Sequence, residues 1–202
     1  MKLYYSPGAC SLSPHIALRE AGLPFELVKV DLKGKVTEHG DDFRKVNPKG
    51  AVPALQLDDG HVLTEGAAIV QYVADRKPEA RLAPAAGSID RYRLQEALNF
   101  VASEIHKGFA PLFYPGYSDD AKALQKASLR ARLDYLEGEL KNRPYLTGDH
   151  YTVADGYLFV VLGWTGYVGL DLADWPTLKA YHARIAGRPA VQAALKAEGL
   201  AG

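Results

Sequence analysis

The sequence predicts two domains of different class: an α/β domain with the element order βαβ-ββα, followed by an all-α helical bundle. Strand-like and helix-like segments alternate within residues 1–77, whereas residues 89–202 show helical periodicity. The intervening residues 78–88 contain two prolines and many small residues, which is typical of a linker. With 202 residues, 48% of them hydrophobic, the chain is large and apolar enough to bury a core.

The first domain begins with a strand, a helix and a second strand. Lys2–Tyr5 is a short strand candidate that a Ser-Pro-Gly turn ends, and Phe25–Val30 alternates as a strand does. Between them, Ser11–Ala21 carries apolar residues at helical spacing and stops at a Gly-Leu-Pro sequence. A βαβ unit of this length predicts a parallel strand pair joined by a right-handed crossover.

The rest of the first domain is predicted as a hairpin and a helix. Residues 33–49 are polar and irregular, with one short helix near Asp42–Val46. Pro53–Leu57 and His61–Leu63 then flank an Asp-Gly turn, which predicts a β-hairpin. Glu65–Asp75 places its apolar residues on one helical face.

The second domain is predicted from three strong helical segments. Residues 89–113 form the first, and leucines at i, i+4, i+7 and i+11 from Leu129 mark the second. Residues 153–164 are apolar nearly all round, which is typical of a helix buried within a bundle. Thr152 and Asp155 form a capping box at the start of that helix.

Charge and cysteine content exclude several classes of function. The chain has 24 basic and 24 acidic residues, so it lacks the cationic surface that nucleic-acid binding needs. Runs of like charge and long apolar stretches are missing, which argues against a membrane anchor. Cys10 is the single cysteine, so an internal disulfide and a cysteine-based zinc site are excluded, and the histidine spacing suggests no metal. We expect a cytoplasmic protein.

Cys10 has the most informative position in the chain, directly before the first predicted helix. A thiol at a helix N-terminus meets unpaired N–H groups and the positive end of the helix dipole. Both favour the thiolate, so the pKa of Cys10 is expected to fall from about 8.5 by a unit or more. The alternative is that Cys10 packs as a small buried hydrophobic residue.

Two short motifs of the first domain suggest a binding site for a peptide with an amino-acid end. Val52-Pro53 precedes the third strand, and a cis bond there would leave the Val52 backbone available to an extended peptide. Most X–Pro bonds are trans, which would give an ordinary strand edge. Glu65 and Gly66 open a helix, where a carboxylate and free N–H groups match the charges of a zwitterion. The alternative is that Glu65 complements the helix dipole.

A polar stripe lies on the first helix of the second domain. Asn99, Ser103 and His106 are three or four residues apart and share a face, with Glu104 and Lys107 beside them. Such a stripe suits either a solvated face or the lining of a cleft.

Taken together, these features resemble the cytosolic glutathione S-transferases over essentially the whole chain. The features that match are a thiol before the first helix, Val-Pro before the third strand and a helical second domain. Cys10 within residues 5–11, together with His106-Lys107, resembles the bacterial beta class. The resemblance implies a thioredoxin-like domain at 1–77 that binds glutathione as co-substrate, a helical domain at 89–202 that carries the second-substrate side, and a homodimer.

The resemblance also implies roles for individual residues. Val52, ahead of a cis Pro53, would pair its backbone with the cysteinyl moiety of glutathione, and Glu65 with the N–H of Gly66 would hold the γ-glutamyl end. Cys10 would lie beside the glutathione sulfur. The other implied positions are the glycyl-side Lys35, the sulfur-side His106 with Lys107 nearby, and Asn99, Ser103 and Glu104 around the γ-glutamyl group, some of them supplied across a dimer interface. Many members have serine where this chain has Gly66.

The implied activity is transfer of the glutathione thiol in detoxification. Conjugation would join it to a small apolar electrophile, and Cys10 would carry out monothiol thiol–disulfide exchange. The second-substrate pocket would draw on aromatic residues that equally suit a helix core: Phe109, Phe113, Tyr114, Tyr117, Tyr157, Trp164 and Tyr167. The alternatives are a mainly glutaredoxin-like redox enzyme, a non-catalytic protein that holds apolar ligands, and a structural or regulatory partner protein that has lost the chemistry.

Overall fold

The structure, a computed structural model, describes residues 1–201 and divides them into two compact units. One unit comprises Met1–Ala83 together with the C-terminal segment from Arg188, and the other comprises Pro84–Gly187. The sequence-based boundaries placed that C-terminal segment in the second domain. It groups with the first unit because its helix packs against the first helix of the chain. Within residues 1–201, no helix is both long enough and apolar enough to span a membrane.

The first unit contains a mixed sheet, which residues 1–201 build from five strands in the order β3-β2-β1-β4-β5. The strands are β1 (Lys2–Tyr5), β2 (Glu26–Asp31), β3 (Val36–Thr37), β4 (Ala54–Gln56) and β5 (Val62–Thr64). β1 pairs in parallel with β2, which confirms the predicted βαβ unit, and β4 and β5 form the predicted hairpin. β3 was not predicted, because a strand of two residues is too short to show alternation.

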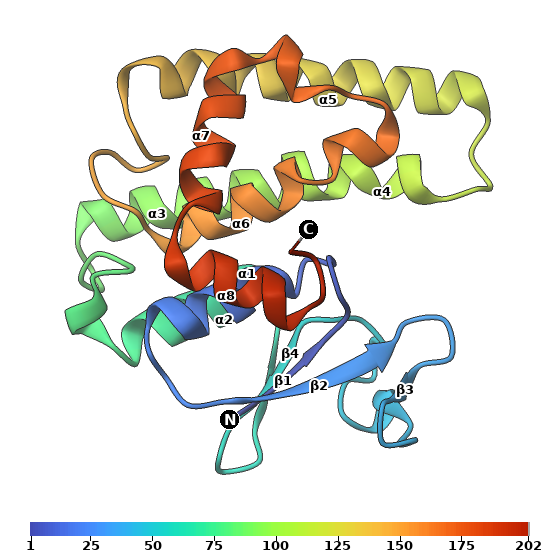
Figure 1. Cartoon of the computed structure of the whole chain (residues 1–202), viewed down its shortest axis with the longest axis vertical. Helices are drawn as coiled ribbons and strands as arrows, with labels where there is room; N and C mark the ends of the chain where they lie inside the picture. Colours follow the sequence, from blue (N-terminus) through green and yellow to red (C-terminus); the bar gives the residue numbers. More distant parts are fainter. Residues whose placement is uncertain (202) are drawn as a thin grey trace. The chain divides into compact units, whose positions relative to one another are not determined.

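Helices cover this sheet and bring the end of the chain back to its beginning. α1 (Leu12–Glu20) packs against α2 (Gly66–Asp75) and against α8 (Pro189–Ala197), and the three lie together on one side of the strands (Figure 1). Short 3₁₀ turns lie at Phe43–Lys45 and Pro78–Ala80. Arg188, at the start of α8, forms a bidentate ion pair with Glu20 at the end of α1, with N···O distances of 2.6 and 2.9 Å.

The second unit is helical, as predicted. Its α-helices are α3 (Ile89–Phe100), α4 (Lys107–Phe113), α5 (Asp119–Glu139), α6 (Val153–Leu162) and α7 (Pro176–Ala186). Shorter 3₁₀ turns are at Leu140–Asn142, Thr165–Val168 and Leu172–Asp174. The single helix expected over residues 89–113 is instead interrupted by a π-helical segment, Val101–His106. Periodicity could not reveal this segment, since one extra residue in a turn shifts the apolar stripe only slightly.

The start of α6 confirms the predicted capping box. The Thr152 backbone N–H donates to Asp155 Oδ2 at 2.8 Å, and every residue of α6 is buried. Asp155 also accepts hydrogen bonds from the Leu146 N–H and the Tyr181 hydroxyl, each at 2.8 Å. Burial raises the pKa of Asp155, and hydrogen bonds from Leu146 and Thr152 oppose that shift. A buried carboxyl group thus joins three segments of the helical unit.

Candidate active site

Cys10 lies in the turn between β1 and α1, and its side chain is partly exposed. Its Sγ donates a hydrogen bond to the Val52 carbonyl oxygen at 3.3 Å. The turn is closed by Ser11, whose hydroxyl donates to the Ser6 carbonyl oxygen and accepts from the Ser6 N–H. The sulfur is therefore held at the end of β1 rather than packed in the hydrophobic core.

The start of α1 differs in detail from what the sequence predicted. The N–H groups of Leu12 and Ser13 already donate to the carbonyls of Ala9 and Cys10, at 3.0 and 3.1 Å. The positive end of the helix dipole thus remains the main backbone contribution to a thiolate at Cys10. The hydrogen bond to Val52 requires a protonated sulfur, so a thiolate must give up this contact.

The loop of residues 47–53 carries the second predicted motif. The Val52–Pro53 bond is cis, as the resemblance implies, and Val52 is buried. Asn47 fixes the loop from inside, because its side-chain amide donates to the Ala51 carbonyl oxygen at 2.7 Å. Asn47 itself is 2% exposed, so the backbone near Val52 is held from the protein interior.

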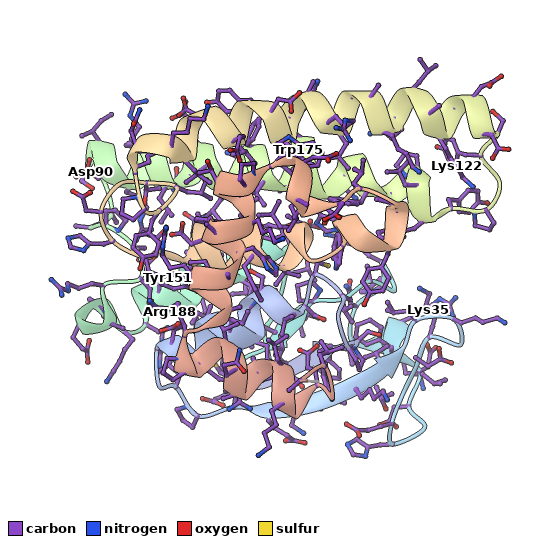
Figure 2. All side chains as sticks on the ribbon, turned by 45° about the horizontal axis from the view of Figure 1, so that its top comes forward. Lys35, Asp90, Lys122, Tyr151, Trp175 and Arg188 are labelled. Atoms are coloured by element: carbon purple, nitrogen blue, oxygen red, sulfur yellow. The ribbon has the colours of Figure 1, made fainter. Side chains whose placement is uncertain are left out.

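Lys35 lies beside the same loop. Its Nζ donates to the Gly50 carbonyl oxygen at 2.8 Å. Lys35, labelled in Figure 2, lies in the turn that joins β2 to β3. The backbone of Lys35 has a φ of 57°, a left-handed conformation that its N–H stabilises by donating to the Asp31 carbonyl oxygen. The structure thus brings Lys35, Cys10 and Val52 to one loop.

Glu65 is the residue directly before α2 and has an unusual backbone, with a φ of 67°. Its carbonyl oxygen accepts from the N–H groups of Ala68 and Ile69, so Gly66 begins the helix. The Glu65 carboxylate pairs with Lys49 Nζ at 2.6 Å, and the same ammonium donates to Thr64 Oγ1 at 3.1 Å. Such a backbone outlier in a non-glycine residue is frequent at ligand-binding sites.

Sequence reasoning did not single out Lys49. The residue follows Pro48 in the loop that leads to Val52, and this proximity to the Val-Pro motif was the available signal. Its pairing with Glu65 depends on how the hairpin brings residue 65 back to the loop, which local sequence does not encode.

His106 is the last residue of the π-helical segment in the second unit. Its Nδ1 and the Tyr157 hydroxyl hydrogen-bond at 2.7 Å, and its ring meets the rings of Tyr157 and Trp164 edge-on. Phe109 and Phe113 stack on one another and both contact Trp164. His106 therefore lies within an aromatic cluster, and Tyr157, which is 4% exposed, fixes the plane of its ring.

The other polar residues of this stripe are exposed on the same stretch of helix. Ser103 Oγ donates to the Asn99 carbonyl oxygen at 2.9 Å, so its hydroxyl is used within the helix. The Glu104 carboxylate accepts from Nε and Nη2 of Arg132 on α5, at 3.2 and 3.1 Å. Lys107 begins α4 and is exposed. The expected role of Glu104 near a ligand therefore competes with an ion pair inside the second unit.

A buried chain of polar groups supports the Cys10 turn, and sequence reasoning missed it. Arg19 Nε donates to His15 Nε2 at 2.8 Å, so the His15 proton lies on Nδ1, which donates to Glu198 Oε1 at 2.8 Å. Glu198 Oε2 accepts from the N–H of Gly8, two residues before Cys10, at 3.0 Å. The side chains of His15 and Glu198 are both 0% exposed.

Comparison with known proteins identifies the family of the two units. The family model described as "Glutathione S-transferase, N-terminal domain" matches residues 8–76, and that described as "Glutathione S-transferase, C-terminal domain" matches residues 100–189. Glutathione S-transferase GstA of Escherichia coli O157:H7 is 51% identical over 200 residues, which cover 99% of this chain and 100% of that protein. Glutathione S-transferase GST-4.5 of Xanthomonas campestris is 40% identical over 207 residues, covering 99% of this chain and 100% of that protein.

Solved structures give the same result. A ternary complex of BphK, a bacterial glutathione S-transferase, is 62% identical with a TM-score of 0.98, covering 99% of this chain and 100% of that one. A sphingomonad glutathione S-transferase complexed with glutathione is 58% identical with a TM-score of 0.97 and the same coverage. A bacterial beta class enzyme of Sphingomonas chungbukensis is 56% identical with a TM-score of 0.97, covering 99% and 100% of the two chains. The chain therefore belongs to the glutathione S-transferase family, and within it to the bacterial beta class.

Proposed function

We propose that the protein conjugates glutathione to small apolar electrophiles and that Cys10 adds a glutathione-dependent thiol–disulfide exchange. Family membership makes the chain a glutathione transferase, and the proposal concerns the substrates and the residues that act. The observation that carries it is the partly exposed Cys10 sulfur, 3.3 Å from the carbonyl oxygen of Val52, beside the loop that contains the cis Val52–Pro53 bond. The likeness to a relative complexed with glutathione supports the choice of ligand.

In this proposal glutathione lies along the loop of residues 47–53. The Val52 backbone pairs with the cysteinyl moiety, ahead of Pro53, and Lys35 attracts the glycyl carboxylate. Glu65 accepts from the γ-glutamyl ammonium, while the N–H of Gly66 donates to the carboxylate at the start of α2. Gly66 offers no hydroxyl but allows the ligand a close approach.

The two reactions share a thiolate nucleophile. In conjugation the glutathione thiol loses its proton, and its sulfur forms a bond to the electrophilic carbon while the leaving group departs with the electron pair. In exchange the Cys10 thiolate attacks the glutathione sulfur of a mixed disulfide, and the other thiol leaves. A second glutathione then reduces the Cys10–glutathione disulfide and leaves as oxidised glutathione, which restores Cys10. No metal takes part in either sequence.

The second unit is proposed to supply the electrophile side. His106 would face the reacting sulfur, and the aromatic cluster around it would accept an apolar substrate. Asn99, Ser103, Glu104 and Lys107 would serve the γ-glutamyl and sulfur sides, some of them across a homodimer interface. The proposed setting is detoxification in the cytoplasm, which the single cysteine supports.

Replacing His106 with alanine is expected to lower the rate of conjugation about tenfold, the effect of losing about 1.4 kcal/mol of transition-state stabilisation. The measurement is kcat/KM with an aryl halide, together with the melting temperature. His150→Ala, an exposed histidine of the same unit, serves as the control and should change neither. A fall in melting temperature with unchanged turnover of the folded protein would show that His106 contributes packing alone.

A direct test of the proposed function has three steps. The protein is first passed over immobilised glutathione, then assayed with an aryl halide and finally with a glutathione mixed disulfide. Retention with turnover in both assays is expected. Retention with turnover of the mixed disulfide alone would indicate a glutaredoxin-like enzyme. Tight binding of apolar dyes without any turnover would indicate a ligand-holding protein and would refute the proposal.

A further inference from the structure

Lys49 and Glu65 form an ion pair at the entrance to α2, next to the proposed γ-glutamyl site. Lys49 Nζ lies 2.6 Å from Glu65 Oε1, and the side chains are 58% and 72% exposed, respectively. The same ammonium donates a second hydrogen bond to Thr64 Oγ1 at 3.1 Å. An exposed pair of this kind contributes little to stability, so it opens at low cost.

The pair consists of one ammonium and one carboxylate, so its charges are complementary to those of an amino-acid zwitterion. The γ-glutamyl end of glutathione carries one ammonium and one carboxylate on the same carbon. Glu65 is complementary to the first and Lys49 to the second, and the N-terminus of α2 adds a favourable field for the carboxylate. In the structure, the Lys49 ammonium is bound to Oε1 of the Glu65 carboxylate, the group that is proposed to receive the ligand ammonium.

We propose that Lys49 is a further substrate-binding residue and that glutathione binds by exchange of ion pairs. The Lys49–Glu65 pair opens, Glu65 accepts the ligand ammonium, and Lys49 moves to the ligand carboxylate. The number of ion pairs rises from one to two, while the net charge of the site stays the same. This inference rests on the proposed function, since it takes the γ-glutamyl group to lie at Glu65.

The exchange gives the site a specificity that Glu65 alone lacks. A single carboxylate attracts any cationic amine, including those of lysine side chains and polyamines. A site that must open its own ion pair loses one contact for every ligand, and it regains that loss through Lys49 when the ligand also carries a carboxylate. Lys49 therefore selects a ligand with both charges close together.

The test is the dissociation constant of Lys49→Gln for three ligands, measured by calorimetry. We expect about fivefold weaker binding of glutathione. An analogue with a neutral carboxamide in place of the γ-glutamyl carboxylate should bind Lys49→Gln at least as tightly as the wild type, because only the wild type has to open the Lys49–Glu65 ion pair and it regains nothing from this ligand. An analogue that lacks the γ-glutamyl amino group but keeps the carboxylate should retain the fivefold sensitivity.

Two further variants complete the design. Lys49→Arg should bind glutathione nearly as well as the wild type, because it keeps the positive charge. Lys45→Gln removes the same charge from an exposed position of the same loop region and should leave binding unchanged. The glutathione affinity of Lys45→Gln controls for the long-range electrostatic effect of removing one positive surface charge, an effect that salt would screen.

The outcomes separate this inference from the proposed function. Tighter glutathione binding by Lys49→Gln would mean that Lys49 merely competes for Glu65, and an equal loss for glutathione and the carboxamide would mean that Lys49 does not contact the carboxylate. Either result overturns the exchange while glutathione binding stands. If the wild type fails to bind glutathione at all, both the proposed function and the exchange are wrong.

Discussion

Replacing Cys10 with alanine is expected to abolish glutathione-dependent disulfide exchange while leaving conjugation measurable. Cys10 is the single thiol of the chain, so no other residue can form the mixed disulfide. Conjugation uses the sulfur of glutathione itself, which the loop of residues 47–53 and other groups of the site can hold without Cys10. We expect the rate of exchange to fall at least about a thousandfold and that of conjugation less than about tenfold.

The matched control for this prediction is Cys10→Ser. A serine hydroxyl can donate to the Val52 carbonyl oxygen as the thiol does, but it is too weak an acid to act as a nucleophile here. Both variants should therefore lose exchange, and a difference between them in conjugation would measure the hydrogen bond to Val52. Intact-mass spectrometry after incubation with oxidised glutathione should show one added glutathione on the wild type and none on either variant. If both reactions were unaffected, Cys10 would be no more than a packed residue.

Replacing Glu198 with alanine is expected to give the largest loss of stability among the changes considered. Its carboxylate is 0% exposed and accepts from both His15 Nδ1 and the Gly8 N–H. Its removal leaves two N–H donors, those of His15 Nδ1 and Gly8, without an acceptor inside the fold, at a cost of about 1–3 kcal/mol each. At roughly 2–4 °C per kcal/mol for a protein of this size, the melting temperature should fall by about 10 °C.

Glu198→Gln tests whether the acceptor chemistry matters more than the shape. The amide has nearly the same size, but its NH₂ group must face either His15 Nδ1–H or the Gly8 N–H, and both are donors. We expect most of the loss seen with alanine. Glu79→Ala, which removes an exposed carboxylate paired with Lys77, should stay within about 0.5 kcal/mol of the wild type. A melting temperature for Glu198→Gln equal to that of the wild type would contradict the assigned His15 tautomer.

Much of the fold followed from local patterns in the sequence. The strands at residues 2–5 and 26–31 and the buried helix at 153–162 have periodicity or composition that tertiary contacts reinforce rather than override. The π-helical segment at 101–106 and the short strand β3 were missed, because each departs from regular structure over too few residues to change a pattern.

The site residues divide in the same way. The sequence singled out Cys10 and Glu65 as candidates because each lies at the start of a predicted helix, a position that local sequence reveals. The ion pair of Lys49 and the acceptor role of Glu198 were not predicted, since both depend on contacts between segments far apart in the chain. Residues 15 and 198 are separated by 183 positions, and no local signal links them.

The return of the C-terminal segment to the first unit affects how that unit can be synthesised and folded. Its sheet is built from residues 2–64, but α8, which packs on α1, follows the whole second unit along the chain. During synthesis, His15 of the first unit therefore lacks its partner Glu198 until the helical unit has left the ribosome. A fragment that stops after residue 83 should consequently be a poor substitute for this unit in isolation, and fusing residues 188–201 to its end through a flexible linker should restore it.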